Sequence, residues 1–204
     1  MLETVYRGAA DESDLYEAAL LTIAAEAAEA AGGTCLITND GVTPTAQLRF
    51  RRSPGNLYLG NFTYVLVSFP DTQRQVEIHL GIFVAGTSRV PHECDVAVLD
   101  WVEAERSRQG GVHPRCSKLI ASIEAKHYAA SPGLGVGRAF IGLATEMGQA
   151  KCTLAFPARG SSSIRPLLAK RRSECYDELV SGAAAAQRLR AHLDQMIRNW
   201  IAAV

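Results

Sequence analysis

The sequence predicts a mixed α/β fold, an α+β arrangement of helices around one mixed sheet, and three observations lead to this class. A segment with helical periodicity opens the chain, several short β-branched or aromatic segments follow it, and a second helical segment leads into a further apolar strand. The chain has 204 residues, 48% of them hydrophobic, which is enough to bury a core without a disulfide or structural metal. The order helix, strands, helix, strand is typical of a layered domain whose second helix crosses over to a parallel strand.

The N-terminal part of the fold is expected to be one helix followed by three strands. Apolar residues recur at helical spacing over residues 12–31, and the glycine pair at 32–33 ends the helix. Short apolar or aromatic segments at 35–38, 46–50 and 63–69 are separated by turn-forming residues. These three segments are therefore predicted to be strands.

The middle of the chain is expected to supply the central strands of the sheet. Residues 75–86 and 94–102 are apolar and joined by a short turn-like stretch, so we predict an antiparallel pair. Residues 119–128 form a further predicted strand. Between them, residues 103–116 are polar and contain two glycines and a proline, which indicates a surface loop.

The C-terminal part is expected to contain two helices and one strand. Helical periodicity covers 134–148, and the apolar segment 151–157 is predicted to be a parallel strand. Residues 173–204 are expected to form one long helix, with a seven-residue repeat of Leu179, Ala186, Leu193 and Trp200. Such a seam fits either a helix of a second subunit or the protein's own sheet. We therefore expect a main domain at 1–157 and a helical extension at 158–204 that packs on it or forms a dimer.

Charge and cysteine content restrict the functional classes. The chain has 21 Lys and Arg against 21 Asp and Glu, so the total charge does not indicate a nucleic-acid partner. Basic residues do cluster at 49–52 and 159–172, where they could hold phosphates or form a solvated face. Five scattered cysteines without a C-x-x-C pair, and no long apolar segment, predict a cytoplasmic protein with no membrane partner.

Three charged residues occupy positions on predicted strands where burial is normally favoured. Glu124 and Lys126 are two residues apart, so they project from the same side of a strand, and Asp95 opens another apolar strand. If these strands are neighbours, Asp95 and Glu124 supply two carboxylates to one point, with the backbone carbonyl of Ala125 as a third oxygen ligand for Mg²⁺. Lys126 would then lie beside the activated water and the scissile phosphate. Glu77, on the strand expected beside Asp95, is a candidate extra ligand.

These residues resemble the motif of the PD-(D/E)XK, or restriction-endonuclease-like, nuclease superfamily. The resemblance covers roughly residues 12–156 and implies a core of helix, three strands, helix and strand. It implies that Asp95 and Glu124 bind metal and that Lys126 is the catalytic lysine, with His127 or Tyr128 assisting. Members of the superfamily often have an additional site glutamate on the first helix, and Glu17 and Glu26 are the candidates for it here. Glu26 or Glu77 is expected as a further ligand of the metal. Cys94 stands where the motif has proline, and the gap from Asp95 to Glu124 is long.

The function implied by this resemblance is a metal-dependent endonuclease that hydrolyses phosphodiester bonds of DNA. Mg²⁺ or Mn²⁺ would be the cofactor, and bacterial restriction or phage defence the setting. The expected partners are DNA, further copies of the chain in a homodimer or larger homo-oligomer, and a partner protein of a defence system. The alternatives are a catalytically inactive nuclease-fold binding or assembly module, and an unrelated enzyme that uses cysteine and histidine covalently.

Two other patterns are weaker. His92, Cys94, His113 and Cys116 have zinc-ligand chemistry but match no standard spacing. The glycine-rich segment 133–137 follows a strand and opens a helix, yet it lacks the third glycine of the dinucleotide-binding fingerprint. We interpret it as an entry to the second helix that lets the helix N-terminus approach a phosphate of DNA.

Overall fold

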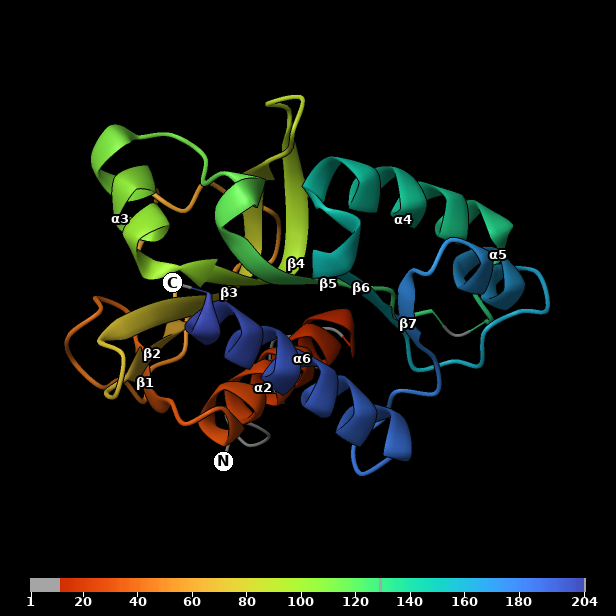
Figure 1. The fold of residues 1–204 in the computed structure, drawn as a ribbon, viewed down its shortest axis with the longest axis horizontal. Helices are drawn as coiled ribbons and strands as arrows, with labels where there is room; N and C mark the ends of the chain where they lie inside the picture. The colour runs from red at the N-terminus through yellow and green to blue at the C-terminus, as the bar shows by residue number, and fades with distance from the viewer. Residues whose placement is uncertain (1–11, 129, 204) are drawn as a thin grey trace.

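The computed structural model describes residues 12–128 and 130–203, which form one seven-stranded sheet with helices on both faces (Figure 1). The strands follow one another across the sheet in the order β1 to β7. Their bounds are β1 Thr34–Thr38, β2 Tyr64–Phe69, β3 Arg74–Ala85, β4 Pro91–Asp100, β5 Leu119–Ala125, β6 Cys152–Ala155 and β7 Glu174–Tyr176. The α-helices are α2 Glu12–Ala30, α3 Trp101–Gly110, α4 Leu134–Met147, α5 Ile164–Lys170 and α6 Ala184–Ala202.

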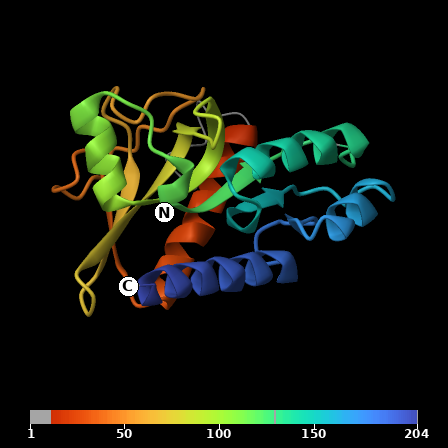
Figure 2. The ribbon, with the colours of Figure 1, turned by 45° about the horizontal axis from the view of Figure 1, so that its top comes forward.

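The pairing of the strands changes from antiparallel to parallel at β5. Strands β1 to β5 pair in antiparallel fashion, whereas β5, β6 and β7 are parallel to one another. Helix α4 connects β5 to β6, and α5 connects β6 to β7, as parallel strands require (Figure 2). The expected crossover helix and its parallel strand are therefore confirmed.

The two faces of the sheet carry separate apolar cores. Helices α2 and α6 cover one face, and α3, α4 and α5 pack on the other, so the fold has three layers (Figure 1). Val96 and Ile123 belong to the first core, while Ala97 and Leu154 belong to the second. Within the described residues, none of the helices has the length and apolar character needed to cross a membrane.

The segment at 103–116, expected to be a surface loop, instead begins inside a helix. Asp100 caps α3 by accepting a hydrogen bond of 2.9 Å from the amide of Val102, and Gly111 ends the helix in the left-handed conformation with φ of 59°. These two capping residues are present in the sequence, but the strongly polar composition of the segment concealed them.

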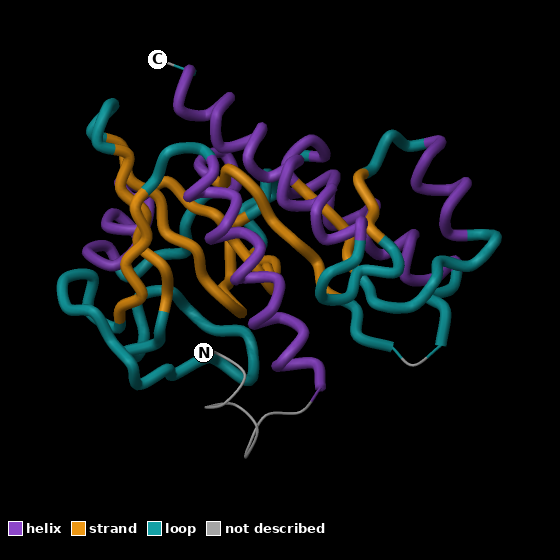
Figure 3. Tube along the Cα trace, turned by 90° about the horizontal axis from the view of Figure 1, so that it is seen from below, coloured by secondary structure: helices purple, strands orange, loops and turns teal. Residues whose placement is uncertain are grey.

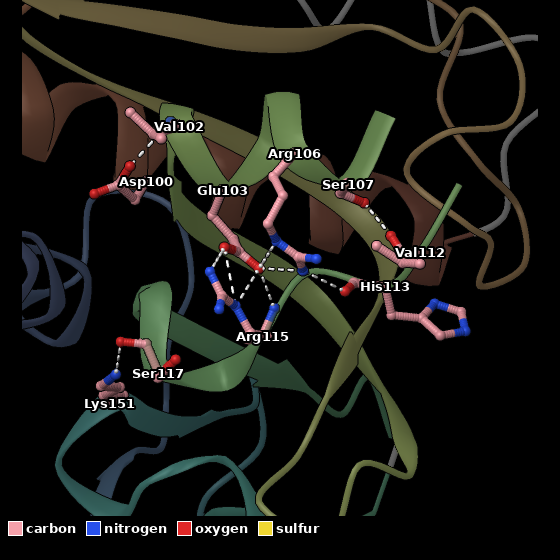
Figure 4. Close-up of polar contacts among 10 residues, drawn as sticks. All are labelled: Asp100, Val102, Glu103, Arg106, Ser107, Val112, His113, Arg115, Ser117 and Lys151. Carbon is pink, nitrogen blue, oxygen red and sulfur yellow. Dashed lines mark hydrogen bonds and ion pairs between the residues drawn. The ribbon is translucent and has the colours of Figure 1, made fainter. Parts of the chain in front are cut away.

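Helix α3 is attached to the protein largely by charged side chains, because Ala104 is its one residue in the described apolar core. Glu103 is only 2% exposed and accepts hydrogen bonds from the guanidinium groups of Arg106 and Arg115 and from the backbone amide of Arg115 (Figure 4). Arg115 lies twelve residues further along the chain, after the helix. The helix therefore depends on a contact that local periodicity does not reveal.

The prediction of one long helix at 173–204 is wrong for the first part of this segment. Residues 174–176 pair with β6 as strand β7, and α6 begins only at Ala184. Leu179, the first residue of the supposed seven-residue repeat, is buried in the connection between them. Helix α6 nevertheless is a long C-terminal helix, and it packs on α2 and on the sheet.

The second strand expected near the N-terminus, at 46–50, is wrong: this segment is part of a long loop between β1 and β2 (Figure 3). Side chains hold this loop together: Asn39 donates to the carbonyl of Gln47, and Arg51 donates to the carbonyls of Asn56 and Leu59. Such contacts replace the regular ladder of a strand.

Candidate active site

The candidate site lies where β4 and β5 separate. Their last register pair towards this end joins Val96 to Ile123. Beyond it, the carboxylate of Asp95 accepts a hydrogen bond of 2.7 Å from the backbone amide of Ala125. The side chain of Asp95 thus bridges the two strands and stands next to the end of β5.

The structure brings the three predicted catalytic residues together. The ammonium Nζ of Lys126 is 2.6 Å from Oε1 of Glu124 and 3.7 Å from Oδ2 of Asp95. Both carboxylates therefore lie within ion-pair distance of the same cation. The three side chains converge because β4 and β5 are neighbours in the sheet. The motif requires this adjacency, and the sequence alone does not reveal it.

Two further acidic residues lie close enough to influence the site. Burial is the largest cause that raises the pKa of Glu17 to about 8, and repulsion from Asp95, Asp14 and Glu93 adds to it. Burial, followed by repulsion from Asp95, also raises the pKa of Glu93. Four carboxylates consequently share the neighbourhood of Lys126.

Docking of α2 on the sheet distinguishes the two first-helix candidates. Glu17 is half-buried and interacts electrostatically with Asp95, whereas Glu26 is exposed and lies about 13 Å further along the helix axis. Glu17 and Glu26 cannot be told apart from the sequence, and Glu26 was a candidate further ligand, but Glu17 is the glutamate that approaches the site. Glu93 was missed, although it lies two residues before Asp95 on β4, a spacing that can share a face of the strand.

The electrostatics of the site indicate a surplus of negative charge. Burial is the main cause that raises the pKa of Asp95 and of Glu124, and repulsion from Asp95 adds to the shift of Glu124. Burial acts to lower the pKa of Lys126, but Glu124 and Asp95 outweigh it and raise this pKa above its ordinary value. One ammonium therefore faces several carboxylates that are costly to ionise together.

The donor set fits a hard divalent cation in its chemistry. Carboxylate oxygens of Asp95 and Glu124, with the backbone carbonyl of Ala125 at the same strand end, are ligands that Mg²⁺ and Mn²⁺ accept. In the described part of the chain, no three His, Cys, Asp or Glu side chains are already gathered as a metal-binding group, the suspected zinc set included. At the candidate site, the Lys126 ammonium contacts both carboxylates.

Glu77, the other candidate ligand, is committed elsewhere. It is fully buried and accepts hydrogen bonds from Arg108, at 2.9 Å and 2.5 Å, while its Oε2 is 2.7 Å from the His79 ring. The ring of His79 in turn stacks on Tyr64, with centroids 4.8 Å apart. This cluster connects β3 to α3, whereas the partners of Asp95 among the described residues are Lys126 and the Ala125 amide, so the expectation that Glu77 lines the same cleft is not met.

The two residues after the lysine point to different surroundings. The ring of His127 lies 5.5 Å from the ring of Tyr16 on α2, measured between centroids. The ring of Tyr128 is exposed and lines a cavity next to Lys126. Of the two, Tyr128 is the more accessible to a bound molecule.

Comparisons with protein-family models, with curated proteins and with solved structures found no match to this chain.

Proposed function

We propose that this protein is a metal-dependent nuclease of the PD-(D/E)XK type that hydrolyses phosphodiester bonds of DNA. The observation that carries the proposal is the convergence of Asp95, Glu124 and Lys126 at the ends of two adjacent strands. The element order supports it as well, because α2, the antiparallel strands β3 to β5, helix α4 and the parallel strand β6 follow the core expected for that superfamily.

Asp95, Glu124 and the Ala125 carbonyl would hold the divalent cation. When bound, Mg²⁺ or Mn²⁺ supplies compensation for the carboxylate charge and polarisation of the scissile phosphate. Lys126, whose pKa is raised, stays protonated near neutral pH and can donate hydrogen bonds to a phosphate oxygen and to the attacking water. Glu17, with a pKa of about 8, is mostly protonated at neutral pH and can donate a proton there.

The wider setting in this proposal follows from the resemblance alone. It comprises action on DNA in bacterial restriction or phage defence, in the cytoplasm, as a homodimer or larger homo-oligomer that works with a partner protein. Helix α6 is already packed on α2 of the same chain, so a second subunit would need another surface or the exposed side of this helix.

A plasmid-nicking assay with Mg²⁺ or Mn²⁺ tests the proposal. Glu124→Ala and Lys126→Ala should lose nicking because each removes a group that contacts the reaction centre, while circular dichroism should show an intact fold. Glu26→Ala is the matched control, since it removes an exposed carboxylate of α2 away from the site. Nicking by both site variants at the wild-type rate would contradict the proposal, and DNA binding without nicking by the wild type would favour a binding module.

A further inference from the structure

A cavity of about 230 Å³ opens directly beside the candidate catalytic residues. Its lining includes Glu124, Lys126 and Tyr128, together with Leu154 of β6 and four residues of α4: Gly135, Val136, Ala139 and Phe140. Phe140 and Leu154 are buried members of the apolar core between the sheet and α4. The lining of the cavity therefore combines charged and apolar side chains.

The chemistry of this lining fits one part of a nucleic acid. A nucleotide joins an anionic phosphate to a flat, weakly polar base, and Lys126 and the apolar wall present matching surfaces side by side. Tyr128 is 45% exposed at the same cavity, where an aromatic ring can stack on a base. A phosphate near Lys126 would consequently leave its neighbouring base within reach of the cavity.

The size of the cavity selects a small occupant. Pockets for drug-sized ligands begin at roughly 300 Å³, so this cavity suits a single ring system rather than a stretch of paired DNA. A base within a duplex is stacked and paired, and it must leave the helix before it can enter such a pocket. An unpaired base meets no such cost.

We infer that the cavity between β5, β6 and α4 receives the unstacked base next to the scissile phosphate, so that single-stranded DNA is the preferred substrate. This inference rests on the proposed nuclease function and adds the substrate class to it. The base lies against Val136 and Phe140, and Tyr128 covers it from the solvent side.

The start of α4 allows the cavity to be narrowed without disturbing the fold. Gly135 lines the cavity and Ala139 follows one turn later on the same face of the helix. A Cβ at Gly135 would meet nothing within 4 Å, and the same holds at Gly142, which is on α4 but does not line the cavity. Because Gly135 and Ala139 line the cavity, we expect Gly135→Phe and Ala139→Phe to obstruct it, and Gly142→Phe is the matched control.

The experiment compares three labelled oligonucleotides of one sequence, with Mn²⁺ present. One is single-stranded, one is the blunt duplex, and one is single-stranded with a single abasic position. We expect the wild type to cut the single strand at least tenfold faster than the duplex, and to cut the phosphate beside the abasic position several-fold less than the same phosphate in the intact strand. The other phosphates of that strand serve as internal controls.

Gly135→Phe and Ala139→Phe should slow cleavage of the single strand and remove the difference at the abasic position, whereas Gly142→Phe should behave as the wild type. Cleavage of the duplex at least as fast as the single strand, or equal cleavage at the abasic and intact positions, overturns the inference and leaves the nuclease proposal standing. Absence of cleavage in all three substrates overturns the nuclease proposal itself.

Discussion

Acidic side chains gather in two regions of this molecule, and the regions differ in the number of positive charges that accompany the carboxylates. Around α3, each buried glutamate is bound by one or more arginines: Glu77 by Arg108, and Glu103 by Arg106 and Arg115. At the ends of β4 and β5, Lys126 is the one cation of the described residues that accompanies four carboxylates, namely Glu17, Glu93, Asp95 and Glu124. The first arrangement is electrostatically complete, and the second is not.

The pKa values separate the two regions in the same way. Burial acts to raise the pKa of Glu77 and of Glu103, but hydrogen bonds and charge from their partners lower it, to about 2 for Glu103. In the candidate site burial prevails, and the pKa values of Asp95 and Glu124 are raised. Acidic residues that serve the fold are thus neutralised within the chain, whereas those of the site need a further cation to ionise together.

The largest expected effect separates the regions by activity. Asp95→Asn keeps an oxygen that can accept the Ala125 amide but removes a charge, so we expect nicking to fall about 100-fold or more while the fold persists. Glu77→Gln should nick within a few-fold of the wild-type rate at a temperature where it is folded. Initial rates on supercoiled plasmid measure both variants, and an unaffected Asp95→Asn would remove the distinction between the regions.

The free energy of unfolding should respond in the opposite order, with a larger loss in Glu77→Gln than in Asp95→Asn. Glu77→Gln leaves the Arg108 guanidinium without its buried partner, and breaking such a pair costs about 3 kcal/mol of the free energy of unfolding. Asp95→Asn should cost much less, because it also relieves repulsion from Glu124. Urea unfolding of both variants gives the comparison, provided that their m-values agree. A larger loss in Asp95→Asn would show that the site acids are the structural ones.

The lowered pKa of Glu103 predicts how stability depends on pH. Since the folded pKa of about 2 is below the ordinary glutamate value of 4.5, ionised Glu103 stabilises the folded state fully above pH 4.5, and this contribution is lost as pH falls towards 2. Its partners are partly exposed, so we expect a contribution of about 2 kcal/mol. Unfolding measured at pH 7 and at pH 3 should show a gap between wild type and Glu103→Gln that shrinks at the lower pH. A constant gap would exclude an electrostatic origin.

Local patterns were sufficient to predict the parts of the fold that pack through apolar periodicity. Helix α4 and the strands β3, β4 and β5 were predicted because their apolar residues repeat with the period of a helix or strand. Period-two alternation likewise placed Glu124 and Lys126 together. The order of the elements then made adjacency of β4 and β5 the natural arrangement.

The errors lie where contacts between distant residues decide the structure. Helix α3 has few apolar residues, and its Glu103 is stabilised by Arg115 from beyond the helix. Glu17 and Glu26 both lie on the first helix, and only the docking of that helix on the sheet selects Glu17. The predicted C-terminal helix was too long because its seven-residue repeat began at Leu179, which lies in the connection before α6. A seven-residue spacing of apolar residues can occur without a continuous helix.

The smallest expected effect is a rise in thermal stability when a divalent cation compensates the surplus carboxylate charge at the candidate site. A divalent cation that binds the folded protein alone, at a concentration ten times its Kd, stabilises it by about 1.4 kcal/mol, which corresponds to a rise in Tm of about 4 °C for a chain of this length. Thermal unfolding with and without Mg²⁺ should show this rise for wild type and for Glu77→Gln, since the arginine-paired region has no deficit for the cation to fill. The rise should disappear in Asp95→Asn. An equal rise in all three proteins would mean that the cation acts elsewhere, and the surplus of carboxylates at β4 and β5 would then require another explanation.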